Sequence, residues 1–141
     1  MFKTIVVAVD GSELCARAIE TIKDLQLSSS TKIILAHVIP LAESELEIAA
    51  DRPHSDLEAV PYRQIEKQLQ AYQAILPFES EIEIVSGDPS EEIIRLANIY
   101  HADLIAIASR GLTGVKRILQ GSVSSQVVEN ASCSVLVVKP G

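Results

Sequence analysis

The chain has 141 residues, of which 48% are hydrophobic and 22% are charged, the balance of an ordinary soluble domain. Its formal net charge of −7 argues against a general affinity for nucleic acid or anionic membranes, because both require a basic surface. No apolar run approaches the roughly 20 residues of a membrane span, and Asp10 follows the first apolar run too early for a signal peptide. We therefore predict a single cytoplasmic domain over residues 1–141.

The first half of the chain alternates strand-like and helical patterns. Residues 3–9 (KTIVVAV) are rich in β-branched side chains, which is typical of a buried parallel strand, and a helix is predicted over 12–25. Residues 32–39 (KIILAHVI) predict a second strand. Residues 42–59 are acidic and irregular, and they predict an excursion over the strand ends. A second helix is predicted over 61–76, beginning at a proline.

The second half continues the alternation. An edge strand is predicted over 81–85, where polar and apolar residues alternate. A third helix begins at the Asp88-Pro89 turn, with Asp88 as its cap. A fourth strand over 103–107, a fourth helix over 122–130 and a last strand over 134–138 complete the chain.

This order predicts the fold class, because strands that alternate with helices form right-handed βαβ units around a parallel sheet. We predict a single doubly wound α/β domain of Rossmann-like type, with five strands and helices on both faces. Ligands bind such sheets at the carboxyl ends of the strands, where the strand order reverses. If the first and fourth strands are neighbours, Asp10 faces the loop at 108–111.

The stretch from Asp103 to Ser125 predicts a phosphate site. Gly111, Gly121 and the hydroxyls of Ser122 and Ser124 lie between a strand and a helix, where free backbone N–H groups and the helix dipole favour an anion. The alternative is that Ser122 or Ser124 only caps its own helix. The chain has no P-loop pattern and no catalytic constellation, so any hydrolysis is expected to be slow.

The chain resembles the universal stress protein family over nearly its whole length, through AVDGSE, LAHVI, GDP and DLIAIASRGLTGVKRILQGSVSS. Nucleotide-binding members carry a glycine, two residues, a second glycine, nine residues, then glycine and Ser or Thr. Gly111, Gly121 and Ser122 match this motif, and Ala108 replaces the first glycine. An alanine there is harmless if its φ is negative, unless the ribose passes directly over its methyl group, but it is strained by roughly 1 kcal/mol or more if φ is positive.

The resemblance implies an adenine-nucleotide site. Asp10 would lie near the ribose or a phosphate-bound Mg²⁺, the backbone of Val38 would bond the adenine edge, and residues 109–111 and 121–124 would approach ribose and phosphates. The implied nucleotide-binding residues are Ala8, Val9, Asp10, Val38, Ile107, Ala108, Arg110, Gly111, Gly121, Ser122, Val123 and Ser124.

The function predicted is that of an adenine-nucleotide-binding stress-response or signalling module with little or no catalysis. The last strand, Ser134 to Val138, would leave an apolar edge if it is outermost, which predicts a homodimer, as the resemblance also implies. The alternatives are an interaction module that binds no nucleotide, a weak ATPase or phosphotransferase, and a flavodoxin-like carrier. The 4% of aromatic residues disfavours the last of these. His37, inside a strand, is predicted to be packed rather than a ligand or base.

Overall fold

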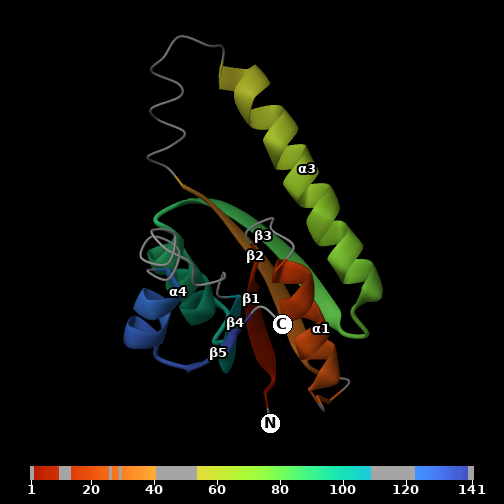
Figure 1. Cartoon of the computed structure of the whole chain (residues 1–141), viewed down its shortest axis with the longest axis vertical. Helices are drawn as coiled ribbons and strands as arrows, with labels where there is room; N and C mark the ends of the chain where they lie inside the picture. Colours follow the sequence, from red (N-terminus) through yellow and green to blue (C-terminus); the bar gives the residue numbers. More distant parts are fainter. Residues whose placement is uncertain are drawn as a thin grey trace.

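The sheet confirms the predicted fold class. The computed structural model describes residues 2–9, 14–25, 27–28, 30–40, 54–108 and 123–139. Within them, five parallel strands form one sheet in the order β3-β2-β1-β4-β5 (Figure 1). The elements are β1 (Thr4–Ala8), α1 (Leu14–Asp24), β2 (Lys32–Pro40), α3 (His54–Ile75), β3 (Glu79–Gly87), α4 (Pro89–Ile99), β4 (Leu104–Ala108), a helix over residues 123–130, and β5 (Ser134–Val138).

The strand β1 lies at the centre of the sheet. Its Ile5 lies opposite Ile33 of β2 on one side and Leu104 of β4 on the other. Successive side chains of a strand point to opposite faces, and here both faces are covered, so the aliphatic runs of β1, β2 and β4 are buried along their length. This double cover explains why these strands are continuously apolar instead of alternating.

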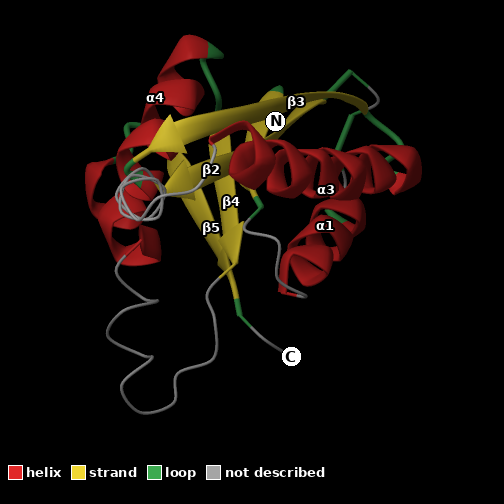
Figure 2. Ribbon diagram, turned by 90° about the horizontal axis from the view of Figure 1, so that it is seen from above, coloured by secondary structure: helices red, strands yellow, loops and turns green. Residues whose placement is uncertain are grey.

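The helices divide between the two faces of the sheet (Figure 2). The cluster on one face joins Val7 to Ala18 of α1 and Leu69 of α3. The cluster on the other face joins Val6 to Leu96 of α4 and to Val127 of the helix over residues 123–130. The arrangement is the doubly wound sandwich that the sequence predicts.

Two predicted boundaries are wrong. Helix α3 begins at His54 rather than at Pro61, so its first turns extend beyond the sheet (Figure 1). Proline is favoured at a helix start because it lacks an N–H, and inside a helix it removes one intrahelical bond and crowds the preceding turn. Helix α3 nevertheless continues through Pro61, and the residues from 54 to 60 contain no glycine to stop it. The edge strand is also longer than predicted, because an outer strand needs only one paired side and tolerates polar residues.

The cap of α4 is confirmed. The Asp88 carboxylate accepts a 3.1 Å hydrogen bond from the backbone N–H of Glu91, and Pro89 occupies the first turn, where its missing N–H costs nothing. Across the described ranges, none of the helices combines the length and apolarity that a membrane crossing requires.

Candidate functional site at the carboxyl ends of the central strands

The strand order reverses between β1 and β4. From β1 the chain adds β2 and β3 on one side, and then β4 and β5 on the other. The register places Ala8, the last residue of β1, opposite Ile107 of β4. This confirms that the first and fourth strands are neighbours, and it fixes the position at which open α/β sheets bind their ligands.

Seven of the predicted site residues fall in the described ranges: Ala8, Val9, Val38, Ile107, Ala108, Val123 and Ser124. They occupy the ends of β1, β2 and β4 and the first turn of the helix over residues 123–130. The predicted Asp10, Arg110, Gly111, Gly121 and Ser122 lie outside the described residues. Ser109 also lies outside them. Asp10 is the predicted magnesium ligand, so that prediction too falls outside the described residues.

Three apolar side chains near this edge belong to, or pack against, the hydrophobic cluster on the α4 face. Ile107 of β4 is buried in the cluster that faces α4, and the half-buried Val38 of β2 and Val123 pack against the same cluster. A purine base needs apolar walls from more than one element, with polar groups at its rim. The half-buried Val38 and Val123 are apolar surface of this kind, whereas Ile107 belongs to the core.

Ala108 is unstrained. It is the last residue of β4 and pairs with Val138 of β5, and its side chain packs against the cluster on the α1 face. Over the ranges that the structure describes, His101 is the only residue other than glycine with a positive φ. The structure thus shows that the residue replacing the first glycine of the motif carries no backbone strain.

His37 holds the end of β1. Its ring is 8% exposed, and its Nδ1 lies 2.6 Å from the carbonyl oxygen of Val9. Because a carbonyl oxygen can only accept, Nδ1 carries the proton and donates. The N–H of Val9 donates in turn to the carbonyl oxygen of Ala36 at 2.7 Å. The prediction of a packed histidine is confirmed, while its partner 28 residues away could not be predicted from sequence.

The helix over residues 123–130 is fixed against α4. The Ser90 hydroxyl lies 2.5 Å from Oε1 of Gln126 and 2.9 Å from the carboxylate of Asp88, the cap of α4. Val127, on the inner face of this helix, is fully buried, and Ser124 in its first turn is also buried. Sequence reasoning missed the Ser90–Gln126 bond, because neither residue belongs to a recognisable motif.

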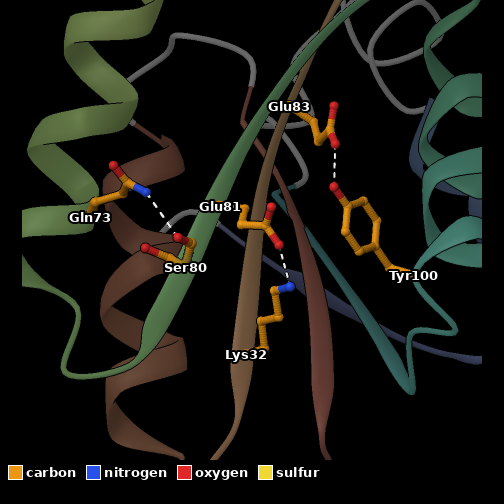
Figure 3. Close-up of polar contacts among 6 residues, drawn as sticks. All are labelled: Lys32, Gln73, Ser80, Glu81, Glu83 and Tyr100. Atoms are coloured by element: carbon orange, nitrogen blue, oxygen red, sulfur yellow. Dashed lines mark hydrogen bonds and ion pairs between the residues drawn. The ribbon is translucent and has the colours of Figure 1, made fainter.

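A second polar cluster lies toward the outer edge of the sheet (Figure 3). Lys32 of β2 forms an ion pair with Glu81 of β3, and its Nζ lies 5.6 Å from the ring centroid of Tyr100. The Tyr100 hydroxyl donates to Glu83, and this bond, followed by burial, raises the pKa of Tyr100 to about 12. A tyrosine that stays protonated at neutral pH joins α4 to β3 and supplies no base. Apart from this cluster, on the α3 side of β3, Gln73 donates a 3.2 Å bond to the backbone oxygen of Ser80 (Figure 3).

The described residues contain no group of three or more His, Cys, Asp or Glu side chains placed to hold a metal ion. Cys133 is a free, half-buried thiol whose pKa is raised by burial, as expected for a packing residue.

The fold and the convergence of strand ends define a class, the α/β proteins that bind ligands at the carboxyl edge of a parallel sheet. Residues 1–139 match the model of the Universal stress protein family, and the chain belongs to that family. A solved structure of MJ0577 from Methanocaldococcus jannaschii is similar with a TM-score of 0.85 and 30% identity, covering 100% of this chain and 98% of that one.

Two further structures share the fold at 24% identity each. One is a universal stress protein in complex with cAMP, with a TM-score of 0.69 over 98% of this chain and 97% of that one. The other is a universal stress protein family protein from Arabidopsis thaliana with AMP bound, with a TM-score of 0.66 over 99% and 92%.

Proposed function

We propose that this protein binds an adenine nucleotide at the carboxyl ends of β1, β2 and β4 and acts as a stress-response or signalling module with little or no catalysis. The observation that carries the proposal is that the β1 and β4 ends, where the strand order reverses, lie beside one apolar cluster that includes Ile107 and against which Val38 and Val123 pack. AMP and cAMP in two proteins of the same fold support the choice of ligand.

In this proposal the base lies against the apolar walls, and the backbone of Val38 bonds its edge. The phosphates lie at Gly121 to Ser124, where the helix over residues 123–130 begins, because the positive end of its dipole favours an anion. If Mg²⁺ binds together with the phosphates, Asp10 would hold it, since carboxylates are its usual protein ligands. The unstrained Ala108 supports binding over the alternative of an interaction module without nucleotide.

Calorimetric titration of nucleotide-stripped protein with ATP, AMP and cAMP, with and without Mg²⁺, tests the proposal. We expect micromolar binding that a Gly121→Val variant loses, because a side chain there would occupy the place of the phosphates. Gly114→Val is the matched control, since Gly114 lies in the nine-residue spacer between the motif positions. No binding to any of the three nucleotides, or equal loss in both variants, would refute the proposed site. ATP turnover above a slow background would instead favour an ATPase.

The proposal also includes a cytoplasmic homodimer formed through β5. This strand is outermost in the sheet and carries the apolar sequence SVLVV. Its outer edge has unpaired backbone groups that a second copy satisfies across a two-fold axis. Light scattering at micromolar concentration should give twice the chain mass, and the mass of one chain would contradict the dimer.

A further inference from the structure

We propose that His37 is a positioning residue of the nucleotide site, which fixes the spacing of the β1 and β2 ends and leaves the Val38 amide available to the ligand. The inference takes its ligand from the proposed function and its geometry from the hydrogen bonds of His37, Val9 and Ala36. It assigns a role to His37, a buried side chain that belongs neither to the apolar residues proposed to contact the base nor to the residues proposed to bind the phosphates.

The geometry begins with the ladder between β1 and β2. The Val9 N–H donates to Ala36, so the next rung of a parallel ladder would join the N–H of Val38 to the carbonyl oxygen of Val9. Among the described residues, the donor to this carbonyl is instead Nδ1 of His37, at 2.6 Å. The imidazole thus takes the place of the backbone donor one residue further along β2.

This substitution has a consequence at each strand end. The buried carbonyl of Val9 is satisfied, which keeps the residue before Asp10 in place. Within the described residues the ladder stops one rung early, so the N–H of Val38 is directed past the end of β1 and not into the β1–β2 ladder. A backbone N–H at the end of a strand, beside an apolar wall, is the kind of donor that a purine ring nitrogen accepts from.

The same two strands carry a matched bond at their opposite ends. The hydroxyl of the fully buried Thr31, just before β2, donates to the carbonyl oxygen of Phe2, just before β1, at 2.9 Å. Beside it, the N–H of Lys32 donates to the carbonyl oxygen of Lys3 at 2.8 Å. Each end of the β1–β2 pair is therefore tied by one buried side chain and one backbone rung, and only the His37 end belongs to the proposed site.

The test compares three variants of the full chain. His37→Phe keeps a ring but removes the donor. His37→Asn keeps a donor, because its Nδ2 is the same number of bonds from Cα as Nδ1 of histidine. Thr31→Val removes the tie at the other end. Two quantities are measured for each protein: the hydrogen-exchange rates of the Val9 and Lys32 amides without ligand, and the Kd for AMP.

We expect His37→Phe to speed exchange of the Val9 amide and to raise the Kd for AMP by about tenfold each, the effect of one unsatisfied buried carbonyl. His37→Asn should restore both to within about threefold of the unmodified protein. Thr31→Val should speed exchange of Lys32 alone and leave the Kd unchanged. This separates positioning at the site from a loss of overall stability.

Two results would overturn the inference: an unchanged Val9 exchange rate in His37→Phe, or a Kd that Thr31→Val raises as much as His37→Phe does. If the unmodified protein binds no AMP, cAMP or ATP, the proposed function fails. The exchange rates then still decide whether His37 sets the end of the ladder, since they are measured without ligand.

Discussion

Restoring the glycine of the family motif by Ala108→Gly should weaken this protein without improving its binding. The residue ends β4, pairs with Val138, and has no need of the φ values that only glycine adopts freely. Glycine would therefore add freedom to the unfolded chain and remove a methyl group that packs against the core on the α1 face.

The size of the effect follows from these two contributions. Glycine inside a strand costs about 0.5–1 kcal/mol, and the half-buried methyl contributes about half of the ~0.8 kcal/mol of a buried methylene. The free energy of unfolding should fall by about 1–1.5 kcal/mol. With an unfolding entropy of about 2.1 cal/mol/K per residue over 141 residues, the Tm should fall by about 3–5 °C.

Urea and thermal unfolding measure the loss, and calorimetry with AMP measures the affinity. Ala106→Gly is the matched control, because Ala106 lies two residues earlier on the same face of β4 and is fully buried. It should lose about 1.3–1.8 kcal/mol, with the Kd unchanged. A tenfold gain in affinity for Ala108→Gly alone would show that the methyl obstructs the ligand. A gain in stability would show that the backbone there favours glycine.

Three further predictions concern other parts of the molecule. One tyrosine should ionise near pH 12, and Glu83→Gln should return it toward 10.0, because the Glu83 bond is the main cause of the raised pKa of Tyr100. The stability that the Tyr100–Glu83 bond supplies is complete below about pH 10 and is lost as the pH rises through about 12. The assay is tyrosine absorbance against pH, with Tyr100→Phe as the control. If all tyrosines titrated together, the prediction would be contradicted. Backbone N–H groups of β1 and of the residue before it lower the pKa of Asp103, so Asp103→Asn should be less stable at neutral pH, by a margin that shrinks as the pH falls below 3.8. Urea midpoints that differ equally at every pH would refute that. Ile105→Ala should cost about 2–5 kcal/mol, because this side chain is fully buried in β4, and a loss under about 1 kcal/mol in urea unfolding would mean that the core refills the space.

The strands could be predicted because short runs of aliphatic residues indicate segments that are buried on both sides. Runs such as residues 5–8 and 104–108 are aliphatic at every position, since helices cover both faces of the sheet. Helix α3 was predicted too short because Pro61 is a start signal that depends on its surroundings, and here the helix passes through it. Local signals identify an element more securely than they identify its end.

The position of the candidate site in the fold could be predicted from the sequence, but most of its hydrogen bonds could not. The convergence of the β1 and β4 ends follows from topology, which the alternation of strands and helices restricts. The donor from His37 to Val9 depends instead on strand register, and register is a property of two segments together. The link from Ser90 to Gln126 likewise joins residues 36 apart whose types carry no specific signal.

The central place of β1 has a consequence for the nascent chain on the ribosome. Ile5 pairs with Leu104, and the Asp103 carboxylate accepts hydrogen bonds from the amides of Lys3 and Thr4. The first strand therefore cannot complete its pairing until β4, near the end of the chain, has been translated. At about 5–20 residues per second, that wait is about 5–20 s. Until then β1 can pair only with β2, and its other edge is an open aliphatic template of the kind that draws strands from other chains. The nascent chain is therefore most exposed to misassembly just before β4 emerges.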